Sequence, residues 1–143
     1  QEVTEPESAG SAEPIVVESV LVDSNVFIDL LRAGKDPARE LMRRFESTDL
    51  VTCGVVRAEV LRGVKSVAVR DKLEAFFDIM RFVEAPDSVW SDTWQLAWHL
   101  DREGRVLPLT DICIAVCAQR AESAVLTSDR HFDQIPDLVV LKQ

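Results

Sequence analysis

The sequence has few of the residues from which soft-metal sites are built. Of its 143 residues, three are cysteines and two are histidines, and no pair of cysteines has the CxxC spacing of a zinc motif. Cys113 and Cys117 lie within the apolar stretch DICIAVCA, where free cysteine packs as a small hydrophobic side chain. We therefore expect reduced, buried thiols and no zinc site.

Long apolar runs and an excess of basic residues are also missing. No apolar run approaches the roughly 18 residues that a membrane-spanning helix needs. The acidic N-terminus lacks the basic start and long apolar stretch of a secretion signal, so a cytoplasmic location without a membrane partner is expected. The net charge of −9 argues against a simple nucleic-acid-binding module, but it is compatible with an enzyme whose carboxylates hold metal ions.

The composition divides the chain into two regions. Residues 1–18 contain five glutamates and no lysine or arginine, and residues 1–14 are rich in Glu, Ser, Ala, Gly and Pro. Such a segment is typical of a flexible acidic extension. The rest of the chain is rich in apolar residues and long enough to bury a core, so a single folded domain is expected over residues 19–143.

Segments with the pattern of strands and of helices alternate along this domain. The expected strands are 19–23, 50–56, 81–85, 124–129 and 138–142. The expected helices are 26–32, 36–47, 57–63, 67–80, 87–104 and 110–121. This alternation predicts an α/β fold with a central, mainly parallel sheet and right-handed crossovers.

Four acidic residues interrupt apolar sequence near the ends of these strands or the starts of these helices: Asp23, Glu59, Asp111 and Asp129. Ligands of open α/β sheets bind outside the carboxyl ends of the strands, which is where these carboxylates are expected to meet. Carboxylates pressed together repel one another, and a divalent cation removes that conflict. Oxygen-rich sites favour Mg²⁺ or Mn²⁺ over zinc, so the pattern predicts a hard-metal pocket.

Each acid taken alone also fits a structural role. Asp23 and Asp111 suit the N-cap of a helix, and Asp129 suits a turn. Glu59 could pair with Arg62, three residues later on the same helix. The occurrence of four such acids, each within an apolar block, is what favours a shared metal pocket.

Four stretches carry a resemblance to a known family: VLVDSNVFIDLL, VVRAEVLRG, LPLTDICIAVCAQRA and AVLTSDRHFDQIPDLVVL. In their order and spacing over residues 19–141 they resemble the PIN-domain nucleases, and most closely the VapC-type toxins of bacterial toxin–antitoxin pairs. The resemblance implies a three-layer α/β/α sandwich and an endoribonuclease that uses one or two Mg²⁺ or Mn²⁺ ions. It also implies an RNA substrate, a cognate antitoxin protein and a homodimer.

The resemblance assigns roles to individual residues. The family's acidic quartet, which is catalytic and binds the metal, falls on Asp23, Glu59, Asp111 and Asp129. Asn25 matches the amide beside the first acid, and Thr110 and Ser128 are expected to support a ligating carboxylate by hydrogen bonding. An inactive PIN fold that serves as a protein or RNA interaction module is the alternative, and the presence of all four acids favours catalysis over it.

A few positions are less informative or depart from the family. AESAV at 121–125 lacks the glycine that often precedes the fourth strand, and IPDL has Asp137 where many relatives have glycine. His131 is interpreted as a structural residue outside the site. Trp90, Trp94 and Trp98 form a stripe at helical spacing, which fits core packing or a protein interface better than a base-stacking platform.

Overall fold

The computed structural model describes residues 2–3 and 15–143 of the chain. Most of the acidic extension, residues 1 and 4–14, lies outside the described residues, so its flexibility stays a prediction. β1 (Glu2–Val3) and β2 (Ile15–Val16) pair in antiparallel fashion as a separate two-stranded sheet. The folded domain begins directly after this pair.

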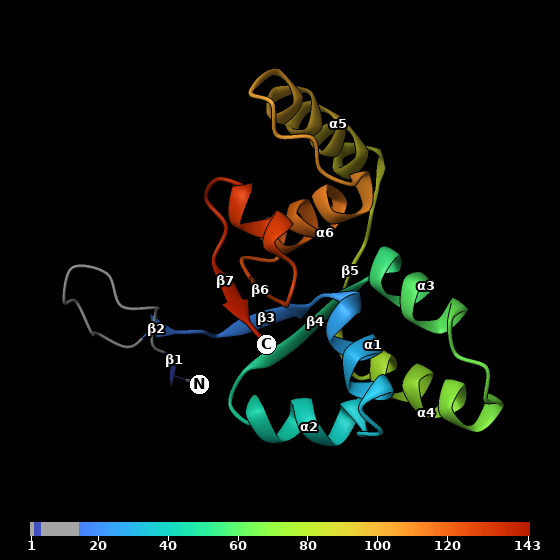
Figure 1. The fold of residues 1–143 in the computed structure, drawn as a ribbon. Helices are drawn as coiled ribbons and strands as arrows, with labels where there is room; N and C mark the ends of the chain where they lie inside the picture. The colour runs from blue at the N-terminus through green and yellow to red at the C-terminus, as the bar shows by residue number, and fades with distance from the viewer. Residues whose placement is uncertain (1, 4–14) are drawn as a thin grey trace.

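A five-stranded parallel sheet forms the centre of the domain (Figure 1). Its strands are β3 (Ser19–Val22), β4 (Asp49–Cys53), β5 (Arg81–Val83), β6 (Ala124–Thr127) and β7 (Val140–Lys142). Their order is β5-β4-β3-β6-β7, and every neighbouring pair is parallel. β3 is central and wholly buried, which explains why its sequence is a continuous apolar run.

Helices cover both faces of the sheet. They are α1 (Ser24–Arg32), α2 (Pro37–Arg44), α3 (Gly54–Arg62), α4 (Val67–Asp78), α5 (Asp87–Arg102) and α6 (Leu109–Arg120). Figure 1 shows α5 and α6 on one side of the sheet and α1, α2 and α4 on the other. The predicted three-layer α/β/α sandwich is therefore confirmed. None of the helices in the described part of the chain is long and apolar enough to cross a membrane.

Most element boundaries agree with the sequence to within two or three residues, and α3 shows the clearest difference. The strand predicted over 50–56 ends at Cys53, and the helix begins at Gly54 instead of residue 57. Val55 and Val56 are β-branched and apolar, which is typical of strands. Val56 is nonetheless a buried residue of α3. The apolar run therefore spans two elements that both contribute to the core.

The core confirms one expectation and corrects another. Cys53, Cys113 and Cys117 are free and buried, as expected for small core side chains. The three tryptophans are 46%, 59% and 48% exposed, in chain order, so core packing is the wrong interpretation for them. The buried side of α5 consists of Val89, Thr93 and Leu100.

Candidate functional site

Asp23 lies at the carboxyl end of the central strand, where β3 leads into α1. Its Oδ1 accepts a 2.8 Å hydrogen bond from the backbone N–H of Ser24 and so caps the helix. Its Oδ2 accepts a 2.7 Å hydrogen bond from the hydroxyl of Thr127, at the end of neighbouring β6. The residue is only 2% exposed. The fold thus holds a carboxylate inside the protein, where hydrogen bonds from the start of α1 and the end of β6 fix its position.

The electrostatic surroundings of Asp23 include two other predicted acids. Burial raises the pKa of Asp23 to about 6, and the negative charges of Asp111 and Glu59 act in the same direction. The hydrogen bonds from Thr127 and Ser24 lower this pKa and so offset part of the effect. Asp111 and Glu59 are therefore close enough to Asp23 to disfavour its ionisation.

Glu59 reaches this group from α3 through a shared hydroxyl. The Ser24 side chain donates a 2.9 Å hydrogen bond to Oε1 of Glu59, and its Oγ lies 3.4 Å from Oδ1 of Asp23. Ser24 is buried at the first position of α1. It connects the acid of β3 with the acid of α3, a role that the sequence analysis did not assign to it.

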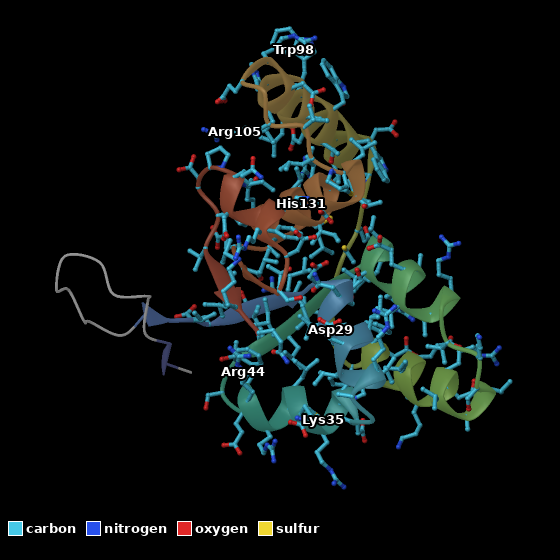
Figure 2. All side chains as sticks on the ribbon, viewed as in Figure 1. Asp29, Lys35, Arg44, Trp98, Arg105 and His131 are labelled. Atoms are coloured by element: carbon cyan, nitrogen blue, oxygen red, sulfur yellow. The ribbon has the colours of Figure 1, made fainter. Side chains whose placement is uncertain are left out.

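Asp111 and Asp129 meet at His131, which is labelled in Figure 2. The Nδ1 atom of His131 is 2.8 Å from Oδ2 of Asp111 and 3.2 Å from Oδ1 of Asp129. Asp129 also caps the short 3₁₀ helix η1 (Arg130–Gln134) by accepting a 2.9 Å hydrogen bond from the His131 N–H. The structure therefore places His131 in contact with two of the predicted acids, although the sequence analysis had left it outside the site.

The pKa shifts of this second group follow from the same contacts. Burial raises the pKa of Asp111, with a contribution from the charge of Asp129, while the hydrogen bond to His131 lowers it. The pKa of His131 is raised, first by its hydrogen bond to Asp111 and also by the charges of both acids. A protonated His131 thus provides positive charge between two carboxylates that would otherwise repel.

Thr127 connects the two groups of acids. Besides donating to Asp23, its Oγ1 accepts a 2.9 Å hydrogen bond from the backbone N–H of Asp129. The Asn25 side-chain amide lies beside it, with Nδ2 3.4 Å from Thr127 Oγ1 and Oδ1 3.4 Å from the Ser128 N–H. Asn25 therefore contacts the loop that carries Asp129.

The two hydroxyls expected to support the acids do not do so. The Ser128 hydroxyl donates to Oδ2 of Asp29 on α1 at 3.2 Å, and Asp29 is exposed. Thr110 is exposed at the start of α6. Within the described residues, the hydroxyls that bond to the four acids belong to Thr127 and Ser24.

The donor set fits a hard divalent cation. Carboxylate oxygens from four acids converge at one edge of the sheet, and the pKa values of Asp23 and Asp111 are raised by burial and by like charge. One ligand atom from each of Asp111, Asp129 and His131 lies within 4.8 Å of the others. A small cation would relieve this repulsion, and oxygen ligands suit Mg²⁺ or Mn²⁺.

Comparison with known proteins agrees with this fold. The family model of the PIN domain matches residues 20–138. Ribonuclease VapC4 of Mycobacterium tuberculosis is 28% identical over 127 residues, which cover 87% of this chain and 97% of the relative. The match therefore extends over nearly the whole of both proteins.

Solved structures with the same fold include two from toxin–antitoxin systems. VapBC2 from Rickettsia felis, bound to a promoter DNA fragment, aligns with a TM-score of 0.73 and 18% identity over 87% of this chain and 98% of that one. DNA-bound VapBC from Salmonella typhimurium aligns with a TM-score of 0.71 and 22% identity over 87% and 97%. Since the matched segment includes β3 to η1 and all four acids, the chain belongs to the PIN domain family.

Proposed function

We propose that this chain is a metal-dependent endoribonuclease, and that it is the toxin of a toxin–antitoxin pair. The observation that carries the proposal is the buried carboxylate of Asp23, which has Asp111 and Glu59 close enough to raise its pKa. A stable protein rarely collects acids in this way without a cation to balance them. The similarity to a curated ribonuclease supports RNA as the substrate.

Asp23, Glu59, Asp111 and Asp129 would hold one or two Mg²⁺ or Mn²⁺ ions. When bound, such an ion lowers the pKa of an attacking water and neutralises negative charge on the scissile phosphate. The protein fixes the carboxylates beforehand: Thr127 and the helix N-terminus orient Asp23, while Ser24 orients Glu59. This preorganisation reduces the reorganisation that binding a cation would otherwise require.

Glu59 has a position suited to handling a proton. One carboxylate oxygen, Oε1, accepts from Ser24, and no hydrogen bond to the other oxygen occurs among the described residues. The side chain is half-buried on α3, beside the buried Asp23. We assign Glu59 either to a ligand of the ion or to the base that takes a proton from the attacking water.

His131 has a role in the metal-free protein. Its ring contacts Asp111 and Asp129 and so supplies positive charge where a cation would otherwise be needed. Because the ring and a divalent cation interact with the same two carboxylates, we expect protonation of His131 to oppose metal binding. His131 thus holds the carboxylates of Asp111 and Asp129 together in the metal-free protein.

The proposed partner is a small antitoxin protein, and the proposed location is the cytoplasm, where RNA is accessible. The two solved structures named above are VapBC complexes, which supports the partner by analogy. The alternative, an inactive interaction module, would keep the fold without needing to bind a metal.

The test is cleavage of structured RNAs, such as tRNA and rRNA stem-loops, with Mg²⁺, Mn²⁺ or EDTA. Asp23→Asn should abolish metal-dependent cleavage, because it removes a ligand charge without changing side-chain size. Asp71→Asn is the matched control, since Asp71 is exposed on α4 and pairs with Arg70. Equal cleavage by wild type and Asp23→Asn would reveal a contaminating nuclease.

Mn²⁺ titration separates the two functions where no RNA is cut. Binding that is lost in Asp23→Asn would support the nuclease site and indicate that the panel lacks the right RNA. No binding in the millimolar range by the wild-type chain would instead support the interaction module.

A further inference from the structure

The acid site has two chemically different ends. One end holds Asp23 and Glu59, and its side chains offer only oxygen atoms to an ion. The other end holds Asp111, Asp129 and His131, where a ring nitrogen lies against both carboxylates. An ion bound at the second end would therefore meet a nitrogen atom that the four predicted acids do not supply.

The side-chain atoms at the second end already have the spacing of neighbouring ligands around one ion. Nδ1 of His131 is 2.8 Å from Oδ2 of Asp111 and 3.2 Å from Oδ1 of Asp129. An octahedral ion with bonds of about 2.1 Å places adjacent ligand atoms about 3.0 Å apart. The two contacts of the ring nitrogen therefore match the edges of such a coordination shell to within a few tenths of an ångström.

The backbone fixes these residues before an ion binds. Asp129 caps η1 by accepting the N–H of His131 at 2.9 Å, so the acid and the ring belong to one short turn. Asp111 lies in the first turn of α6, which packs against η1. Figure 2 shows His131 next to this helix. Little rearrangement is then needed for the three side chains to bind one ion, which lowers the cost of coordination.

The second end is also accessible from solvent. The side chain of His131 is 40% exposed and that of Asp129 is 31% exposed. A cation can therefore reach the ring nitrogen and both carboxylates from water. Three protein ligands at an open site leave further positions for water, as catalytic metal sites require.

We propose that His131 is a ligand of the ion at this end, and that it raises the affinity for first-row transition-metal ions relative to Mg²⁺. Imidazole nitrogen suits ions such as Ni²⁺ and Zn²⁺, whereas Mg²⁺ is held by oxygen atoms. The Nδ1 lone pair forms the bond to the metal, and a proton carried by that nitrogen is released to solvent. This role rests on the proposed function, since it concerns the ion that the same acids would hold.

The rival interpretation is a ring that only holds the two acids together and leaves them when an ion binds. Substitution of His131 would alter metal affinity in either case. A ligand, however, leaves a nitrogen signal in the spectrum of the bound metal and changes the affinity for Ni²⁺ and for Mg²⁺ unequally. The two measurements below use these differences.

The first measurement is pulsed electron paramagnetic resonance of the full chain, without a histidine tag, saturated with Mn²⁺ at pH 8. The wild type should show the modulation of a directly bound imidazole nitrogen. The sequence contains one other histidine, His99, which is exposed on α5 beside Trp98. His99→Gln is therefore the matched control and should keep the signal, whereas His131→Gln should lose it.

The second measurement is calorimetric titration with Ni²⁺ and with Mg²⁺ at the same pH. His131→Gln should lower the Ni²⁺ affinity at least about tenfold and change the Mg²⁺ affinity by less than about threefold. His131→Asp replaces the nitrogen by an oxygen ligand, so it should bind Mg²⁺ well and lose most of the preference for Ni²⁺. It also serves as the test if His131→Gln does not fold, as judged by circular dichroism.

Two results would overturn the assignment of His131 while leaving the proposed nuclease intact. One is Mn²⁺ bound to the wild type without a nitrogen signal. The other is an equal loss of Ni²⁺ and Mg²⁺ affinity in His131→Gln, which would make the ring a support for the two acids. A wild-type chain that binds none of these ions in the millimolar range would contradict the proposed function as well.

Discussion

The hydroxyl of Thr127 donates a 2.7 Å hydrogen bond to Oδ2 of Asp23, across 104 residues of sequence. This contact joins the carboxyl ends of β3 and β6, the two strands whose ends carry Asp23 and, two residues beyond Thr127, Asp129. The same hydroxyl oxygen accepts the N–H of Asp129. One threonine thus sets the position of two acids that belong to separate strands.

Thr127→Val should therefore impair the site while leaving the shape of the side chain almost unchanged. The variant removes the donor to a buried carboxylate, so the pKa of Asp23 should rise further. Loss of a hydrogen bond that orients a metal ligand typically lowers metal affinity or activity by about 10- to 100-fold. Mn²⁺ titration and RNA cleavage would measure the loss.

Two controls accompany this variant. Thr127→Ser keeps the hydroxyl and should retain most of the affinity. Thr110→Val alters an exposed threonine and should have little effect. Wild-type Mn²⁺ affinity in Thr127→Val would show that the hydrogen bond does not orient the site.

The stability of the metal-free protein should fall as the pH rises. The pKa of Asp23 is about 6 in the folded chain and near its ordinary value of 3.8 when unfolded. The folded state thus binds this proton more tightly than the unfolded state does. The resulting contribution to the free energy of unfolding is lost as the pH rises from about 4 to above 6. The free energy of unfolding falls by about 3 kcal/mol in total, since each pKa unit corresponds to about 1.4 kcal/mol. The raised pKa values of Asp111 and His131 act in the same direction.

Urea denaturation in EDTA at pH 5 and pH 7.5 measures this effect. Asp23→Asn cannot ionise, so at pH 7.5 its free energy of unfolding should exceed that of the wild type by about 2–3 kcal/mol. The difference should narrow at pH 5. A variant less stable than the wild type at pH 7.5 would contradict the burial of an unbalanced charge at this position.

His131 should make metal binding more dependent on pH than the acids alone would. A protonated ring between Asp111 and Asp129 competes with a cation for the same oxygens. His131→Gln removes the charge. The ratio of its Mn²⁺ affinity to that of the wild type should therefore be several-fold larger at pH 6 than at pH 8. If both proteins show the same pH dependence, His131 does not compete with the metal.

The sequence predicted the fold and the four acids because their signals are local. A buried strand followed by an acid, as at Asp23, can be read from neighbouring residues, and parallel strands end at one edge. The contacts of Ser24 with Glu59, of Thr127 with Asp23 and of His131 with Asp111 were missed because the partners lie 35, 104 and 20 residues apart in the sequence. A hydroxyl at the end of β6, adjacent to β3, is the signal that could have identified Thr127.

For Trp90, Trp94 and Trp98 the sequence left core packing and a protein interface open, and their exposure excludes the first. A period of 3.6 residues shows that a helix has an apolar face, but it does not show what covers that face. α5 has two apolar sides, one formed by Val89 and Leu100 and the other by the tryptophans. Only the packing of α6 against the first side decides which belongs to the core.

Two residues adopt a backbone conformation that glycine tolerates better. Glu122, between α6 and β6, has φ of 53°, and Asp137, before β7, has φ of 58°. Both lie in the segments where the sequence departs from the glycine often found in the family. Left-handed φ values are unfavourable for residues with a Cβ atom by about 1 kcal/mol or more, partly offset by the greater freedom of glycine in the unfolded chain. Glu122→Gly and Asp137→Gly should therefore each stabilise the protein by a few tenths to about 1 kcal/mol.

Thermal unfolding of the two glycine variants, singly and together, measures this gain. Glu103→Gly is the control, because Glu103 has a φ of −90° at the end of α5 and glycine there only adds freedom to the unfolded chain. It should lower the melting temperature, whereas the first two should raise it. If both glycine variants melt below the wild type, the contacts of these side chains outweigh the backbone strain. The acids would then be retained for their own interactions, in spite of their conformation.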